Sequence, residues 1–214
     1  MRRPERPWDK RLTLLQRLWG VIRFPSVTFW DIAHEPDRKG PALIFLGNLT
    51  AIGLWYVAMV SHIIGASASL IFGFAGILFI LTVFYMLLSL VYFGLIQFAI
   101  GLAGRKGTFA ETFLMGQYAH LPFFFANLAS FGVLMVLLPP AHLGSLAELY
   151  LNPLWLVVYG LASVALLWGA LLLALGIRAR YRLTTNIALV ITFSVTVFMV
   201  IIAFIVRLTV PPVI

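Results

Sequence analysis

The chain has 214 residues, of which 62% are apolar and 10% are charged, and its mean hydropathy is +1.03. A soluble domain is about 25% charged, so this composition excludes an ordinary soluble protein, and the long apolar runs exclude collagen-like and disordered chains. The net charge is +8, and the absence of cysteine excludes disulfides and thiolate metal sites. These values are typical of an all-α membrane protein with several spans.

The first 40 residues are predicted to form a cytoplasmic amphipathic segment, and residues 41–214 a membrane domain. An apolar stripe recurs at helical spacing in the N-terminal segment through Trp8, Leu12, Leu15, Trp19 and Ile22. A basic helix with tryptophan on its apolar flank is typical of a helix lying in the membrane interface. A helix packed against the cytoplasmic ends of the spans fits the pattern equally well, and both can hold. The residues predicted to contact lipid are Trp8, Lys10, Arg11, Arg17, Trp19 and Arg23.

Five apolar segments follow, and each is long enough to cross a bilayer, which takes about 20 helical residues. Before them, Ser26 is predicted to cap a short helix that ends at His34, in front of Pro36. A short external turn is expected at residues 65–69. The predicted spans are residues 41–64, 70–102, 122–139, 153–176 and 186–206.

The basic residues predict the orientation of these spans. Residues 1–40 carry nine lysines and arginines, the connection after the second span carries two, and the connection after the fourth carries three. The other two connections carry none, and Arg207 alone lies on the opposite side. By the positive-inside rule the N-terminus is cytoplasmic and the C-terminus is outside or lumenal. The basic residues lie almost entirely on the predicted cytoplasmic side, as the positive-inside rule requires. The net positive charge therefore does not indicate a nucleic-acid partner.

A further helix is predicted between the second and third spans. Thr108 and Glu111 have the spacing of a capping box, so a helix is expected to begin there and to run to residue 120. This segment is polar for mid-membrane, so it is predicted to be interfacial or re-entrant and to bend into the third span at Pro122. Thr184 or Thr185 is expected to cap the last span.

Neutral polar residues at membrane depth are the candidates for a transport path. Asn48, Gln97 and Asn127 are the most costly of these to leave unpaired, so they are expected to face the interior of the bundle. Such groups more often join helices by hydrogen bonds than form a path for a solute.

Catalytic and metal sites are not expected. The four histidines fall two on each side of the membrane, and every aspartate and glutamate lies in an extramembrane or interfacial segment. The sequence has no G-x-S-x-G or Gly-rich phosphate loop. Glu111 and His120 are a remote candidate for acid–base work, and a capping glutamate with an interfacial histidine explains them better. The prediction is a protein that is not an enzyme and has no metal or other cofactor.

Three sequence motifs together resemble the Yip family, the Ypt/Rab-interacting-protein membrane domain, over about residues 24–208. They are F-P-S-V-T-F-W-D from Phe24, G-T-F-A-E-T from Gly107 with Q-Y-A-H-L-P ending at Pro122, and L-G-I-R-A-R-Y-R-L-T-T-N-I-A from Leu175. The second is the most specific, and its residues Thr108, Phe109, Tyr118 and Pro122 are the family-motif candidates. The resemblance implies five spans and a cytoplasmic N-terminus.

Eukaryotic members of the family are linked to prenylated Rab GTPases, vesicle traffic and membrane shaping. This chain lacks their D-L-Y-G-P-like motif and their G-Y-S version of the second motif. Its short basic N-terminus resembles the prokaryotic branch, in which a Rab partner is not expected.

The resulting hypothesis is a non-enzymatic integral protein of a prokaryotic cell membrane that organises membrane or partner proteins. Its expected partners are the lipid bilayer, anionic lipids among them, and an unidentified membrane or cytoplasmic protein, with a homo-oligomer left open. The alternative is a small transporter or channel, or a membrane subunit of a transport complex, working through Asn48, Gln97 and Asn127. A polar cavity through the bundle would favour this alternative.

Overall fold

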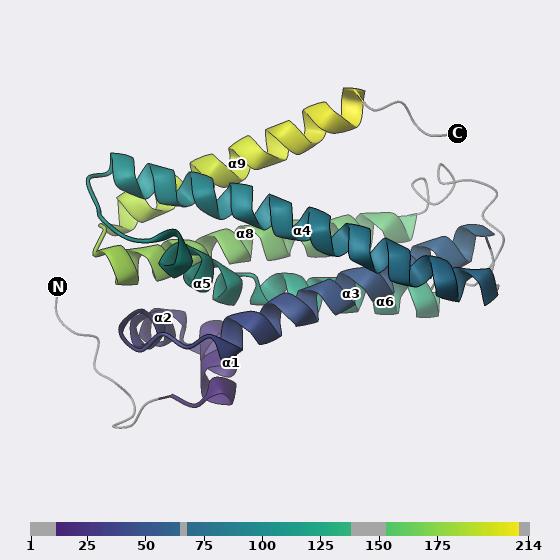
Figure 1. The fold of residues 1–214 in the computed structure, drawn as a ribbon, viewed down its shortest axis with the longest axis horizontal. Helices are drawn as coiled ribbons and strands as arrows, with labels where there is room; N and C mark the ends of the chain where they lie inside the picture. Colours follow the sequence, from purple (N-terminus) through teal and green to yellow (C-terminus); the bar gives the residue numbers. More distant parts are fainter. Residues whose placement is uncertain (1–11, 65–67, 138–152, 210–214) are drawn as a thin grey trace. The chain divides into compact units, whose positions relative to one another are not determined.

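A computed structural model of the chain describes residues 12–64, 68–137 and 153–209, and all regular secondary structure in these ranges is α-helix (Figure 1). The helices are α1 (Leu14–Arg23), α2 (Pro25–His34), α3 (Lys39–Ile64), α4 (Ala68–Leu102), α5 (Phe109–Ala119), α6 (Leu121–Leu137), α8 (Pro153–Tyr181) and α9 (Thr185–Thr209). The predicted lipid contacts Trp8, Lys10 and Arg11 lie outside the described residues, as does most of the expected turn at 65–69.

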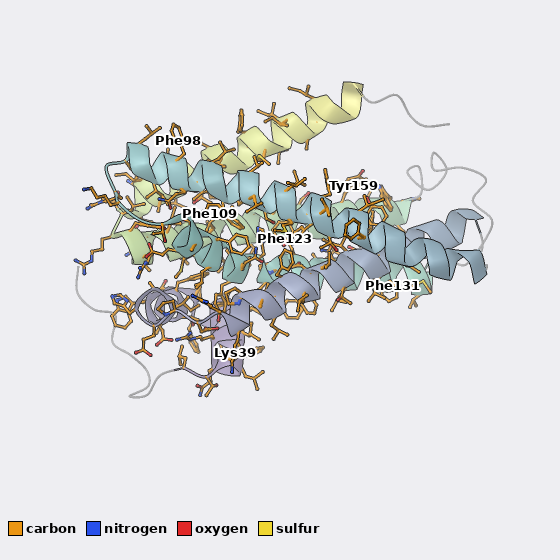
Figure 2. All side chains as sticks on the ribbon, viewed as in Figure 1. Lys39, Phe98, Phe109, Phe123, Phe131 and Tyr159 are labelled. Atoms are coloured by element: carbon orange, nitrogen blue, oxygen red, sulfur yellow. The ribbon has the colours of Figure 1, made fainter. Side chains whose placement is uncertain are left out.

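Five helical stretches are long and apolar enough to cross a membrane, which confirms the predicted all-α, five-span fold. The third stretch begins at Phe109 rather than after Pro122. It covers α5 as well as α6, because α5 is also apolar enough to be counted with the span. The stretches are Lys39–Ala58, Thr82–Leu102, Phe109–Val136, Pro153–Tyr181 and Thr185–Ile205. Large apolar side chains project from them, for example Phe98, which is 65% exposed (Figure 2). Such surfaces are expected on helices that face lipid.

The chain divides into two compact units. Unit 1 comprises Met1–Asp37, Leu88–Ala119 and Ala170–Ile214, and unit 2 comprises Arg38–Leu87 and His120–Gly169. Each unit is therefore built from segments that lie far apart in the sequence.

In unit 1, α1 begins at a reciprocal capping box. The backbone N–H of Thr13 donates to Gln16 Oε1 (2.9 Å), and that of Gln16 donates to Thr13 Oγ1 (3.4 Å). Pro25 occupies the first turn of α2, where its missing N–H leaves no helix bond unmade. The two helices approach closely at Gly20, where an added Cβ would lie 2.3 Å from Thr28 Oγ1. A helix thus occupies the predicted N-terminal segment, while its role as an amphipathic membrane helix stays a prediction.

The connection from α4 to α5 has two local signals. Gly104, at φ +73°, ends α4 in the left-handed conformation, and the N–H of Arg105 donates to Ile100 O (3.2 Å) in a Schellman pattern. The predicted capping box then begins α5: the N–H of Thr108 donates to Glu111 Oε2 (3.2 Å), and the N–H of Glu111 donates to Thr108 Oγ1 (3.4 Å). The expected start of this helix is confirmed.

A break at His120 separates α5 from α6, close to where Pro122 predicted a bend. Proline has no N–H to bond the carbonyl of Tyr118, so the helix cannot continue unbroken through this position. The N–H of Phe123 donates instead to His120 O (3.0 Å). The interfacial or re-entrant placement of residues 108–120 stays a prediction, and more than half of α5 is buried.

Unit 2 is built around the packing of α3 against α6. Gly47 allows a close approach, since an added Cβ would lie 3.2 Å from the ring of Phe124. Farther along the same two helices, Ala58 and Leu134 form an apolar cluster with Trp155 of α8, and the rings of Trp55 and Trp155 are 5.8 Å apart.

Candidate functional site

The densest polar cluster among the described residues lies in unit 1, where it joins the N-terminal helices to α5 and α8. It has three parts, named here by their central residues. The Arg17 clamp contains Arg17, Asp31, Asp37 and Tyr118; the Arg180 bridge contains Arg180, Glu111 and Ala33; and the Gln97 node contains Gln97, Gly107, Thr108, Thr112 and Tyr181.

The Arg17 clamp fixes α1 from its inner face. Arg17 is 1% exposed, its Nε donates to Asp31 Oδ2 (3.0 Å), and its Nη2 lies 2.9 Å from the same oxygen. Its Nη1 pairs with the carboxylate of Asp37, which also accepts a hydrogen bond from the Tyr118 hydroxyl (2.7 Å). One guanidinium therefore joins α1, α2 and the link to α3, and Tyr118 extends the contact to α5.

Arg17 stays charged in this buried position. Desolvation lowers its pKa, but the hydrogen bond to Asp37 and the negative charge of Asp31 outweigh that effect and raise the pKa above its ordinary value. The prediction that Arg17 faces lipid headgroups is therefore wrong. The face opposite the apolar stripe, which periodicity alone assigns to water or headgroups, packs in this protein against α2.

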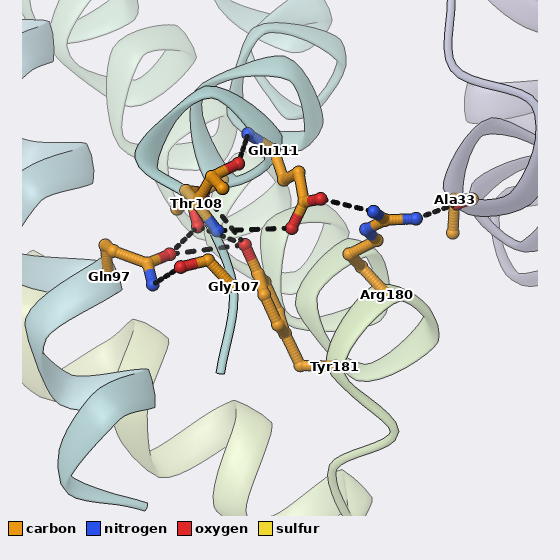
Figure 3. A network of polar contacts seen from close by, with 8 residues as sticks. Ala33, Gln97, Gly107, Thr108, Glu111, Arg180 and Tyr181 are labelled. Carbon is orange, nitrogen blue, oxygen red and sulfur yellow. Dashed lines mark hydrogen bonds and ion pairs between the residues drawn. The ribbon is translucent and has the colours of Figure 1, made fainter. Parts of the chain in front are cut away.

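The Arg180 bridge connects α8 to α5 and to the end of α2 (Figure 3). Arg180 Nη2 pairs with the carboxylate of Glu111, and Nη1 donates to the backbone oxygen of Ala33 (2.6 Å). Ala33 lies in the last turn of α2, where carbonyls have no partner within the helix, so a cation is favourable there. Both charged side chains are 31% exposed, so solvent and salt screen this ion pair more than the Arg17 clamp.

The Gln97 node ties the α4–α5 connection to α8. Gln97 Nε2 donates to Gly107 O (3.1 Å), and its Oε1 accepts from the hydroxyls of Thr112 and Tyr181. The Thr112 and Tyr181 hydroxyls lie 2.6 Å apart. Figure 3 shows the Tyr181 ring beside Gly107, and a Cβ there would lie 2.1 Å from Tyr181 Cε1. The glycine of the G-T-F motif thus makes room for the tyrosine that the node needs.

The three predicted intramembrane polar residues have separate surroundings. Gln97 belongs to the node in unit 1, whereas Asn48 and Asn127 belong to unit 2. Asn48 is fully buried, and its Nδ2 donates to Ile44 O (3.1 Å) and to His120 O (3.3 Å) at the break between α5 and α6. Asn127 is half-buried. Asn48 and Gln97 both satisfy backbone carbonyls beside helix ends, which is a structural use of a buried amide.

The other predicted site residues divide between the surface and the network. Trp19 and Arg23 are exposed on α1, and Phe109 is 37% exposed at the start of α5. Thr108 and Tyr118 belong to the network, and Pro122 lies at the α5–α6 break.

Sequence reasoning missed the acidic partners Asp31 and Asp37 and the role of Arg180. Asp31 is the last residue of the F-P-S-V-T-F-W-D motif, so the motif could have indicated it. Arg180 was used only among the basic residues that predict the orientation of the spans.

The network has the chemistry of a structural joint. The carboxylates of Asp31, Asp37 and Glu111 are each paired with an arginine. Within the described ranges, no three histidine, aspartate or glutamate side chains gather as metal ligands would. What the arrangement does is hold α1 and α2 in a fixed position on α5 and α8.

Fold and network together define a multi-span helical membrane protein with its N-terminal helices locked onto the bundle. The model of the Yip1 domain matches residues 19–205, so the chain belongs to the Yip1 domain family. The resemblance in the three motifs is thereby confirmed at the level of the family, and the prokaryotic branch stays a prediction. Comparison with curated proteins and with solved structures found no match.

Proposed function

We propose that this Yip-family protein is a non-enzymatic organiser of membrane or partner proteins, and that its N-terminal helices α1 and α2 are the contact module. The observation that carries the proposal is the Arg17 clamp. In the clamp, Arg17 and the carboxylates of Asp31 and Asp37 hold a segment that precedes all five spans, and the Arg180 bridge adds a second connection to the same segment. A buried ion pair is weak evidence for stability, but here Arg17 joins Asp31 of α2 and Asp37 beyond it, which fixes one arrangement of α1 on α2. A fixed arrangement is what a contact module requires.

We place this module in the cytoplasm, on the side predicted by the basic residues, and the protein in a prokaryotic cell membrane. Because the native chain has no cysteine, single cysteines can test the orientation without background. A cysteine beside Gly65 or Gly144, in connections outside the described residues, should react with an impermeant thiol reagent added to intact cells. One beside Arg105 or Arg180 should react only after permeabilisation. The reverse pattern would invert the topology.

The proposed contact role can be tested by cross-linking the full chain in native membranes and identifying what co-purifies. The wild type should retain specific partners, and Arg17→Met, which frees α1 from its place in the module, should lose most of them. Arg23→Met, on the exposed side of the same helix, serves as the matched control for a lost charge. Identical partners with and without Arg17 would contradict the proposal.

A transport function is the second candidate, and one observation favours it. Asn48 Oδ1 is buried with no hydrogen-bond partner in the described residues, although the amide nitrogen of the same side chain is satisfied. A solute or water on a path through unit 2 would provide the missing donor. If the chain is a subunit of a transport complex, Arg17→Met should keep its partners in the same cross-linking experiment. Asn48→Leu should lose transport activity, which a separate transport assay measures.

A further inference from the structure

The outer face of α1 is an apolar surface that no described helix covers. Leu15, Trp19 and Ile22 are 76%, 60% and 37% exposed, and they recur at i, i+4 and i+7. That spacing places them on one stripe of the helix. Arg17, Gly20 and Val21, on the other side, are buried. The clamp therefore holds α1 with three large apolar side chains directed away from unit 1.

This stripe, the α1 stripe, is held close to the point where the chain enters the first span. Arg17 pairs with Asp37, and α3 begins at Lys39, two residues later. Two residues span at most about 7 Å, so the clamp cannot lie far from the start of that span. Figure 1 also shows α1 running across the direction of the part of α8 that belongs to unit 1. A helix that lies close to the start of a span in the chain and runs across the direction of a spanning helix has the placement of an interfacial helix.

The charge beside the stripe indicates which surface it meets. Arg23 follows Ile22 and is exposed, and unit 1 also exposes Arg105, Lys106 and Arg182 at its helix connections. Of the four acidic side chains in the described part of unit 1, Asp31, Asp37 and Glu111 are paired with Arg17 and Arg180, and the fourth, Glu35, is half-buried. The exposed charge of the described part of unit 1 is therefore mainly positive, which complements an anionic bilayer surface.

We infer that the α1 stripe is a preformed docking face for the anionic surface of the bilayer, with Leu15, Trp19 and Ile22 at the boundary of headgroups and acyl chains. This inference rests on the proposed function and names the partner of its contact module. Arg23 meets headgroups, whereas Arg17 acts as a positioning residue that sets the angle of the stripe without touching lipid. Docking consequently requires no folding of the helix on the membrane.

The test uses the full-length protein reconstituted into vesicles, with a single spin label on Leu15→Cys or Ile22→Cys. Ser26→Cys, which is exposed on α2, is the control position. In vesicles of phosphatidylcholine with phosphatidylglycerol, labels at 15 and 22 should be more accessible to oxygen than to a water-soluble nickel chelate. The label at 26 should show the opposite. In pure phosphatidylcholine the inserted population should fall.

Variants that change the charge of α1 measure how much electrostatic attraction contributes to docking on anionic vesicles. A basic residue near an anionic surface contributes enough to change an equilibrium about fivefold, so Arg23→Gln should shift the docking equilibrium by up to that factor on anionic vesicles. Arg23→Lys should preserve it. Arg17→Lys, which keeps the charge but changes the clamp, should alter the depth of the labels.

Three results would overturn the inference. Labels at 15 and 22 in water on both vesicle types would exclude membrane docking. Equal insertion on both would exclude the preference for anionic lipid. Labels that neither oxygen nor the nickel chelate can reach would mean that a protein, such as a second copy of this chain, covers the stripe. The first and third results leave the proposed contact role standing, because partner loss in Arg17→Met is measured separately.

Discussion

Hydrogen exchange of the α1 amides should accelerate more than a hundredfold when Arg17 is replaced by methionine. The substitution removes the guanidinium that pairs with both Asp31 and Asp37, and the Asp31 side chain is only 4% exposed. Removing one partner of a buried ion pair typically costs about 3–5 kcal/mol, because the charge that remains, here the Asp31 carboxylate, stays buried without its cation. Opening of α1 from unit 1 becomes easier by that amount, and exchange through the opened state reports it directly.

Arg23→Met is the control, since it removes the same type of side chain from an exposed position of the same helix. Exposed substitutions usually change stability by less than about 0.5 kcal/mol, so exchange in this variant should stay within a few-fold of the wild type. Equal exchange in the two variants would show that the clamp contributes nothing to holding α1. Far-UV circular dichroism of the whole chain should be nearly unchanged in both, because five spans dominate the helical signal.

The elements that sequence reasoning predicted well are those set by local physics. A span needs only an uninterrupted apolar run, and the runs here are long. The capping box at Thr108 and the cap at Thr184 are contacts over three residues, so residue types at fixed spacing are enough to find them. The break near Pro122 has the same origin, because the missing N–H belongs to the proline itself.

The polar network could not be predicted in this way because its partners lie far apart in the sequence. Arg17 is 14 residues from Asp31 and 20 from Asp37, and Asp37 is 81 residues from Tyr118. Periodicity assigns Arg17 to the polar side of α1, which is correct, but it cannot tell whether that side meets water, headgroups or another helix. The acidic partners on α2 and on the link to α3 decide the question.

Glycines in contact with aromatic rings were also beyond sequence reasoning, and Gly116 is the clearest case. A Cβ at this position of α5 would lie 1.9 Å from Phe93 Cε1. Phe93 is fully buried, and its ring packs edge-on against Phe113 with centroids 5.5 Å apart. The ring therefore has little room to move, and the two helices must separate to accept a methyl group.

Gly116→Ala should consequently lower the free energy of unfolding by about 1–3 kcal/mol, the usual cost of overpacking a core. Gly94→Ala is the matched control, because Gly94 lies in α4 and an added Cβ meets nothing within 4 Å. At that position alanine should stabilise the helix by about 0.5–1 kcal/mol. Denaturation of the two variants in mixed micelles, followed by circular dichroism, measures both values. Opposite signs are expected, and a loss of the same size at both positions would mean that the α4–α5 contact at Phe93 is not a close one.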